Sequence, residues 1–238
     1  PVSSLIHAAT MVAAGVFLVA RVFPLFEASS SVMNIVALTG GVTAVLAAAM
    51  GLASNDIKRV LAFSTVSQLG YMFIALGVGA PGVALFHLFN HAFFKCLLFL
   101  SAGSVHHSVR TFDMRYMGGL RKWMPVTYGL TVISGLSLAG VFPFAGFWSK
   151  DEVLAAAWNV EQSAPGTSAV GQMVFWLAVI AAGMTAFYVF RLVIMTFHGE
   201  FRGGIDSVPM VDRIPDEAHD HVHKGESPVS MVGPMLVL

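Results

Sequence analysis

Long apolar runs, separated by short polar connections, dominate the chain. A helix of about 20 apolar residues can cross a bilayer, so runs of this length are the main signal for membrane spans. The pattern predicts an all-α, polytopic transmembrane helix bundle. We predict six spans and the start of a seventh: residues 4–24, 32–54, 60–79, 83–104, 126–158 and 170–197, and a run that begins near 229.

The fifth run, residues 126–158, is too long for one straight span. Its middle reads SGLSLAGVFPFAGFWSK and contains Gly140, Pro143 and Gly146. Glycine and proline interrupt helices, and broken helices occur in membranes where other protein or a water-filled cavity satisfies the freed backbone groups. We therefore predict a helix broken at mid-depth, near residues 135–150.

The same pattern divides the chain into three regions. Residues 1–197 form the predicted transmembrane domain, 198–228 a polar, histidine-rich cytoplasmic loop, and 229–238 the start of a further, truncated span. The chain begins without an initiator methionine and ends inside an apolar run, so we expect it to be a fragment of a longer protein.

Three histidines of the polar loop, His219, His221 and His223, have acidic residues close by in the sequence. They could bind a metal ion, but ligands that alternate along an extended chain lack a fixed geometry. A solvated, flexible loop is the better interpretation.

Composition supports the membrane assignment and narrows the chemistry. The chain is 56% hydrophobic and 11% charged, whereas soluble domains carry about 25% charged residues. Its formal net charge is zero, and no basic tract indicates binding to nucleic acid. One cysteine, Cys96, excludes an internal disulfide and a cysteine-based metal or iron–sulfur site. The chain also lacks G-x-G-x-x-G and P-loop motifs, so we expect redox or ATP chemistry to lie on other chains or in missing parts.

Positive charge predicts the orientation in the membrane, because cytoplasmic loops carry an excess of lysine and arginine. The connections LFEASSS, GVGAPG and NVEQSAPGTS contain neither residue, although Arg21 lies near that side. The opposite side should be cytoplasmic. Its basic residues are Lys58, Arg59, Arg110, Arg115, Arg121, Lys122, Arg202, Arg213 and Lys224.

The most unusual apolar stretch is HLFNHAFFKCLLFL, residues 87–100, which carries two histidines and a lysine. On a helix, His87, His91 and Lys95 share one face, with Asn90 beside them. Intramembrane ionisable groups are costly and are functional candidates for that reason. A zinc site would need a third ligand and would not favour an ammonium one turn away. Hydrogen bonding between helices and a proton relay remain as alternatives, and the relay fits three titratable groups better.

A second lysine, Lys150, follows the predicted break in GFWSKDEVL, with Asp151 directly after it. The lysine could extend toward the headgroups at the membrane surface. The break favours a functional position instead, because it gives a lysine at depth a hydrated cavity. An acidic residue near a helix start is also favoured by the helix dipole.

Further polar positions have two interpretations each. Ser64, Ser67 and Gln68 share a face of the third span, and His7 shares a face of the first span with other polar residues. Such stripes can hold water between titratable groups or join helices by hydrogen bonds. Asp56 and Lys58 precede the third span, where they are a point of proton access or only determinants of topology.

Five ordered motifs resemble a known family, the antiporter-like subunits of the proton-pumping NADH:quinone oxidoreductase (respiratory complex I). The resemblance is greatest to the subunit L (chain 5) branch and runs from Pro1 to the last span. The large subunit of the multi-subunit cation (Na⁺/K⁺)/proton antiporters shares nearly all the motifs and is the alternative. The motifs are PVSSLIHAATMVAAGVFLVAR, NDIKRVLAFSTVSQLGYMF, HLFNHAFFKCLLFLSAGSV, MGGLRKWMPVTY and LAGVFPFAGFWSKDEVL.

The resemblance implies a fold of two inverted repeats, each with a broken helix, of which this chain is the second repeat with flanking spans. It implies proton translocation driven by electron transfer from NADH to quinone in partner subunits. NADH, FMN, iron–sulfur clusters and quinone are then expected on those partners, with no cofactor in this chain. The family often has two adjacent prolines at the break, whereas this chain has Pro143 alone.

The resemblance also implies roles and surroundings. Lys95 matches the central proton-pathway lysine, Lys150 with Asp151 the terminal one, and His7 a histidine of the connecting path. The expected partners are the antiporter-like subunit M, its neighbours and the lipid bilayer. The expected location is the bacterial inner (plasma) membrane.

Overall fold

The computed structural model describes residues 2–159, 168–209, 222 and 225–238. All regular elements within these residues are helical. They are α1 (Val2–Ser4), the π-helix η1 (Leu5–Ala9), α2 (Met11–Arg21), α3 (Phe23–Glu27), α4 (Ser30–Ala53), α5 (Ile57–Gly77), α6 (Pro81–Val109), α7 (Pro125–Ala139), α8 (Ala145–Trp158), α10 (Ser168–Phe197) and α11 (Val229–Val237), with the 3₁₀ turns η2 (Met114–Tyr116), η3 (Leu120–Lys122) and η4 (Gly204–Ser207).

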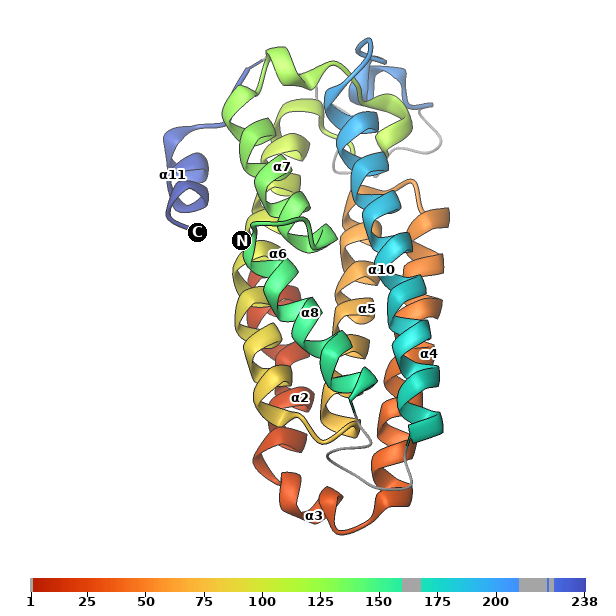
Figure 1. The fold of residues 1–238 in the computed structure, drawn as a ribbon. Coiled ribbons are helices and arrows are strands. Elements are labelled where there is room, and N and C mark those ends of the chain that lie inside the picture. Colours follow the sequence, from red (N-terminus) through yellow and green to blue (C-terminus); the bar gives the residue numbers. More distant parts are fainter. Residues whose placement is uncertain (1, 160–167, 210–221, 223–224) are drawn as a thin grey trace.

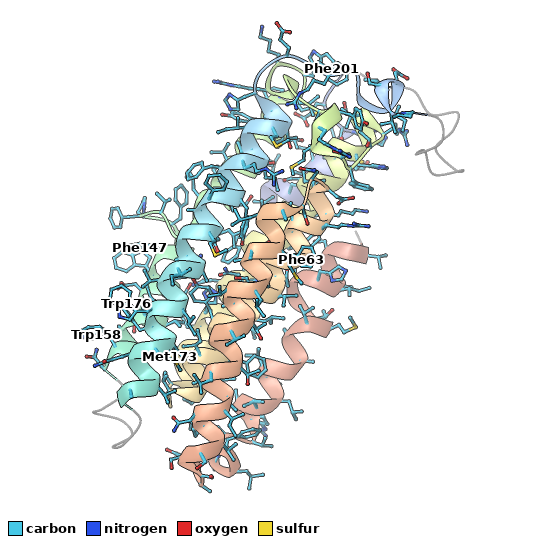
Figure 2. The ribbon with its side chains drawn as sticks, turned by 90° about the vertical axis from the view of Figure 1, so that its right-hand side faces the viewer. Phe63, Phe147, Trp158, Met173, Trp176 and Phe201 are labelled. Atoms are coloured by element: carbon cyan, nitrogen blue, oxygen red, sulfur yellow. The ribbon has the colours of Figure 1, made fainter. Side chains whose placement is uncertain are left out.

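The predicted all-α membrane bundle is confirmed. Within the described ranges, α4, α5, α6 and α10 are long and apolar enough to cross a membrane. They run along the length of the bundle, with α7 and α8 placed end to end beside them and α11 at the edge (Figure 1). Figure 2 shows Trp158, Met173 and Trp176 projecting from the outer face, where all three are exposed. Exposed apolar side chains of this kind suit a surface that meets lipid or other membrane chains.

The first predicted span, residues 4–24, is helical over most of its length but is not one unbroken helix. The helical segments Leu5–Ala9 and Met11–Arg21 are separated at Thr10. The Thr10 amide donates to the Leu5 carbonyl at 3.3 Å and its hydroxyl donates to the same oxygen at 2.8 Å. This i→i+5 bond is that of a π-helical turn, which widens the helix locally.

The fifth predicted span is the broken helix, and the structure gives it as α7 followed by α8. Gly140 ends α7 with φ +79°, a left-handed conformation that glycine adopts without strain. The amides of Gly140 and Val141 donate to the carbonyls of Ser137 and Leu136 at 3.1 and 3.0 Å. Pro143, which has no N–H, lies in the loop before α8.

The basic connections meet at one end of the bundle, as the orientation analysis requires (upper end in Figure 1). The Ile57 amide donates to the Phe112 carbonyl at 2.9 Å, and the Gly119 amide donates to the His198 carbonyl at 3.1 Å. These bonds join the α4–α5, α6–α7 and post-α10 connections. Arg213, Lys224 and the three loop histidines 219, 221 and 223 lie outside the described residues.

Helix α5 lies at the centre of the bundle and touches α4 at backbone distance. A methyl group built on Gly70 would lie 2.6 Å from the Gly40 carbonyl oxygen and 2.7 Å from the Ala44 nitrogen. Small residues allow such close approach between membrane helices. The contact fixes the position of α5, whose buried face carries Ser64, Gln68 and Tyr71.

Gly70→Ala therefore should destabilise the protein by about 1–3 kcal/mol, because the added methyl forces α4 and α5 apart. Gly183→Ala on α10 is the matched control, since no atom lies within 4 Å of its added methyl. Thermal unfolding of the purified full-length protein in detergent measures both. Equal midpoints for the two variants would show that the helices do not pack as described.

Candidate functional site

Lys95 is fully buried in the centre of α6. Its Nζ donates a hydrogen bond to the Leu61 carbonyl at 3.2 Å and another to the Ser64 hydroxyl, both on α5. Among the described residues the ammonium has no carboxylate partner. A buried cation costs several kcal/mol unless polar groups surround it, so the α5 backbone takes the place of a counter-ion here.

His87 lies two turns before Lys95 on the same helix and is also fully buried. Its Nδ1 lies 2.8 Å from the Ser149 hydroxyl on α8, and its Nε2 lies 3.1 Å from Oε1 of Gln68 on α5. The imidazole thus joins three helices that come from distant parts of the sequence.

His91 shares the face of His87 and Lys95, as the spacing predicts, but it does not complete a hydrogen-bonded row. The ring centroids of His87 and His91 are 6.4 Å apart, and the Phe94 ring lies 5.5 Å from His91. The Nε2 atom of His91 is buried without a hydrogen-bond partner. The ring also interacts with the backbone of Ala8 in η1.

Lys150, in the first half of α8, is 4% exposed and points back into the break. Its Nζ donates to the Leu138 carbonyl of α7 at 2.5 Å and lies 5.5 Å from the centre of the Tyr71 ring. Leu138 is in the last turn of α7, where carbonyls lack an intrahelical partner and the helix dipole favours a cation. The break therefore creates the acceptor that holds this lysine.

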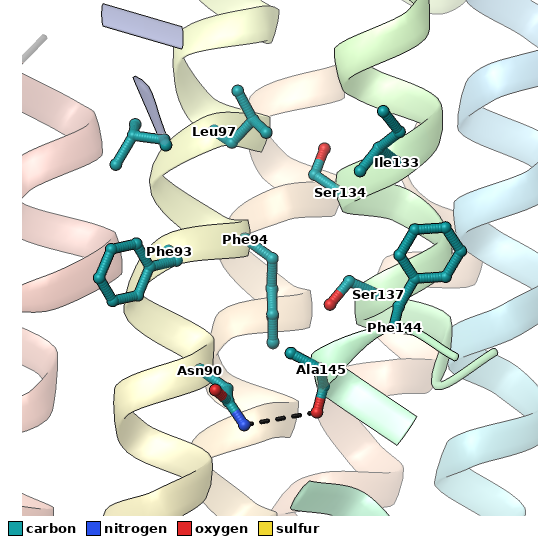
Figure 3. Close-up of a pocket in the computed structure, with 10 residues that line it drawn as sticks. Asn90, Phe93, Phe94, Leu97, Ile133, Ser134, Ser137, Phe144 and Ala145 are labelled. Atoms are coloured by element: carbon teal, nitrogen blue, oxygen red, sulfur yellow. Dashed lines mark hydrogen bonds between the residues drawn. The ribbon is translucent and has the colours of Figure 1, made fainter. Parts of the chain in front are cut away.

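Asp151 and Asn90 lie at the margins of this arrangement. Asp151 is exposed, and no ion pair joins it to Lys150 within the described part of the chain. Asn90 is half-buried and its Nδ2 donates to the Ala145 carbonyl at 3.3 Å (Figure 3). This bond lies beside a cavity of about 230 Å³ between α6 and the break, lined mainly by apolar residues with Ser134 and Ser137 on α7.

His7 faces a cavity of about 180 Å³ together with Lys58, Arg59, Ala62 and Phe99. The ring of His7 stacks on Phe99 with centroids 5.7 Å apart. Ala62 follows the residue whose carbonyl binds Lys95, and Phe99 lies one turn beyond Lys95 on α6. The cavity therefore reaches from the basic end of the bundle toward Lys95.

Asp56 lies beside a larger polar cavity of about 460 Å³ at the same end, with Asp113 and Arg115 on its wall. It caps α5 by accepting from the Arg59 amide at 2.9 Å. The Nζ atom of Lys58 lies 3.9 Å from the centre of the Phe112 ring. Asp113 is partly buried, which alone would raise its pKa, but hydrogen bonds from Arg115 and its charge outweigh this effect and lower the pKa below the ordinary value.

The polar stripe of α5 divides between two roles. Ser64 and Gln68 face the titratable groups, as described above. Ser67 instead donates to the Ala44 carbonyl of α4 at 2.9 Å. Its hydroxyl joins two helices and does not contact a titratable side chain.

Two polar residues of the site escaped the sequence analysis. Ser149 gave no signal beyond its place between the break and Lys150. Arg191 is the only charged residue in the apolar run 170–197, and that isolation was a signal. Its guanidinium donates to the carbonyls of Leu52 and Ser54 at 2.6 and 2.8 Å, so it caps the C-terminal end of α4.

The arrangement suits proton transfer better than substrate binding. The two lysines and His87 each contact hydroxyl, amide or backbone carbonyl groups, which accept or orient protons. Within the ranges that the structure describes, no three metal-ligating side chains lie together. A membrane bundle with an interrupted helix and buried titratable side chains is typical of ion-translocating membrane proteins.

The chain belongs to the NADH:quinone oxidoreductase/Mrp antiporter transmembrane family, which matches residues 1–185. It is 46% identical to NAD(P)H-quinone oxidoreductase chain 5 of Picosynechococcus sp., over the whole chain and 36% of the relative. It is 45% identical to NADH-quinone oxidoreductase subunit L of Rickettsia bellii, over the whole chain and 34% of the relative. The predicted resemblance is confirmed, and the chain spans about a third of the length of these relatives.

A solved structure shows the same fold. The chain matches the Mrp complex from Dietzia sp. DQ12-45-1b with a TM-score of 0.77 and 22% identity, over 93% of this chain and 46% of that one. At this identity the likeness shows the fold alone. It confirms the predicted antiporter-like fold.

The contact between Gly140 and Lys150 gives a test of the site. A methyl group built on Gly140 would lie 3.3 Å from Cδ of Lys150, at a φ of +79° that L side chains rarely adopt. We expect Gly140→Ala to lose about 1–2 kcal/mol of stability from the backbone alone. Thermal unfolding measures the loss, with Gly129→Ala, whose added methyl meets nothing within 4 Å, as the control on α7. Indistinguishable variants would contradict the described end of α7.

Proposed function

We propose that this chain is part of a membrane-arm subunit of a proton-pumping NADH:quinone oxidoreductase. In this proposal it carries protons across the membrane, and electron transfer from NADH to quinone in partner subunits drives them. The observation that carries the proposal is the pair of buried lysines, Lys95 and Lys150, which backbone oxygens hold with no carboxylate partner among the described residues. The buried His87 lies on the helix of Lys95 and contacts Ser149, the residue before Lys150. The names of relatives 45–46% identical support the coupling to quinone reduction.

Lys95 acts as the central proton carrier. Its ammonium is stabilised by the Leu61 carbonyl and the Ser64 hydroxyl, and both groups also tolerate a neutral amine. Because no carboxylate pins the charge, a small change in the local field is enough to release the proton. The charges of Lys95 and Lys150 also repel each other, so protonation of one lysine disfavours protonation of the other.

In the proposal, the other residues admit, exchange, release or support the protons and their carriers. Protons reach Lys95 from the basic end of the bundle, past His7 and the cavities beside Asp56 and Lys58. His87 and His91 exchange protons with Lys95, and Lys150, next to Asp151, releases them on the far side. Asn90, Ser64 and Gln68 support these groups, and Ser67 holds α5 against α4.

The setting follows from the same proposal. The basic end faces the cytoplasm of a bacterial cell, and the bundle spans the inner (plasma) membrane. The membrane partners are the antiporter-like subunit M and its neighbours. NADH, FMN, iron–sulfur clusters and quinone are held by partner subunits, since the one cysteine of this chain cannot hold a cluster.

Replacing Lys95 by methionine in the complete complex tests the proposal. A positioned proton carrier accelerates transfer by about a hundredfold or more, so Lys95→Met should stop transfer through this subunit on the timescale of turnover. Protons pumped per NADH, measured with a pH-sensitive dye in closed membrane vesicles, should fall. Lys122→Met, which removes an exposed lysine at the basic end, should leave the yield unchanged.

Two results would contradict this function. An unchanged proton yield in Lys95→Met would leave the polar stripes as structural links between helices. Proton flux that requires Na⁺ or K⁺ and continues without NADH oxidation would instead identify a cation/proton antiporter.

A further inference from the structure

The hydrogen bonds between the two buried lysines cross helices and do not follow α6. Lys95 donates to Ser64 on α5, Gln68 lies one turn further on α5, and Gln68 contacts His87. His87 contacts Ser149, the residue before Lys150 on α8. Among the described residues, Ser64 and Gln68 are not hydrogen-bonded to each other; they lie one helical turn apart, where Cβ atoms are about 5–6 Å apart. One water molecule bridges such a distance.

The alternative route along α6 lacks these contacts. His87 and His91 are not hydrogen-bonded to each other, and their ring centroids are 6.4 Å apart. The Phe94 ring lies beside both of them, 6.4 Å from His87 and 5.5 Å from His91. An aromatic ring offers no site for a travelling proton, so the shared face of α6 is a poorer path than the one through α5.

Ser149 can serve His87 as either donor or acceptor. Besides His87 Nδ1 at 2.8 Å, its hydroxyl has the Ala145 carbonyl at 3.3 Å and the Gly146 carbonyl at 3.5 Å. A hydroxyl has one hydrogen and two lone pairs. When the hydrogen points at Nδ1 it donates to the ring, and when it points at a carbonyl the oxygen accepts from the ring.

Gln68 has the same property on the other side of the ring. Its Oε1 lies 3.1 Å from Nε2 of His87, while its own Nε2 is buried and has no hydrogen-bond partner. A buried amide nitrogen without a partner is uncommon and calls for a reason. Since that N–H group makes no bond, the amide can turn and present it to His87 without losing another contact.

We propose that Gln68 and Ser149 are positioning residues that let His87 pass a proton between the Lys95 side and the Lys150 side of the bundle. This inference rests on the proposed function and adds the route, which runs through α5 and α8. The two partners keep both ring nitrogens hydrogen-bonded in every protonation state of His87. The ring therefore never leaves a buried nitrogen unpaired, which would cost about 1–3 kcal/mol.

Each passage of a proton through His87 conserves the number of protons on the ring and its partners. In the neutral ring, Nε2–H donates to Gln68 Oε1 and Nδ1 accepts from the Ser149 hydroxyl. Ser149 then gives its hydrogen to Nδ1 and receives one from the donor on the Lys150 side, and the cationic ring donates at both nitrogens. The Nε2 proton then passes, through a water molecule that bridges Gln68 and Ser64, to the neutral amine of Lys95, and the ring is left as the second neutral tautomer, which the turned Gln68 amide supports. One proton enters, one leaves, and the reverse sequence is equally balanced.

Pumping by the complete complex in closed membrane vesicles tests the route. The variants are Ser149→Ala and Gln68→Met, which remove the two partners, and Ser149→Thr, which retains the hydroxyl. Ser101→Ala is the matched control, because this buried hydroxyl on α6 has no partner. Lys95→Met gives the level expected when this subunit does not pump, and NADH oxidation with an artificial electron acceptor confirms that each complex is assembled.

The proposal expects Ser149→Ala and Gln68→Met to lower protons per NADH to the level of Lys95→Met. It expects Ser149→Thr to keep at least half of the normal contribution and Ser101→Ala to keep all of it. A normal yield in Ser149→Ala and Gln68→Met, with the yield of Lys95→Met reduced, overturns the route but not the function. An equal loss in Ser149→Thr and Ser149→Ala also overturns it, since packing would then explain the effect.

Discussion

Two buried ammonium groups that have no carboxylate partner in the described part of the chain are the constraint on which the rest of the structure depends. A cation removed from water must be surrounded by polar atoms, and in this bundle backbone carbonyls supply them. The carbonyl that binds Lys150 is free only because α7 stops at Ala139, so the interrupted helix and the lysine require each other. The carbonyl that binds Lys95 belongs to α5, which ties the position of α5 to that of α6.

The rigid part of the bundle and the polar part meet on α5. One side of this helix touches α4 at Gly70, with room for hydrogen only, and Ser67 adds a hydrogen bond to the same neighbour. Other positions of the helix carry Ser64 and Gln68 toward the buried cation and imidazole. The close contact with α4 thus sets the distance at which those two polar side chains meet α6.

Apolar run length and glycine–proline content were enough to predict the bundle, the four long helices and the break. The shared face of His87, His91 and Lys95 also followed from spacing. The meeting of His87 with Gln68 and Ser149 did not, because they come from three helices and only the packing of those helices brings them together. Apart from such polar stripes, lipid-facing and core-facing sides are both apolar in sequence, so the sequence does not show which faces of different helices meet. The resemblance gave roles to the lysines, but the contacts depend on the packing.

Helix α8 is a single segment of 14 residues, and neighbouring positions near its start make both the contact with His87 and the contact with the end of α7. Because both positions belong to one short helix, α8 cannot move one of these side chains without moving the other. Any shift of α8, whether driven by a neighbouring subunit or by a change in local charge, therefore alters the two contacts together. In the proposed path, the interrupted helix therefore links the contact at His87 with the contact at the end of α7.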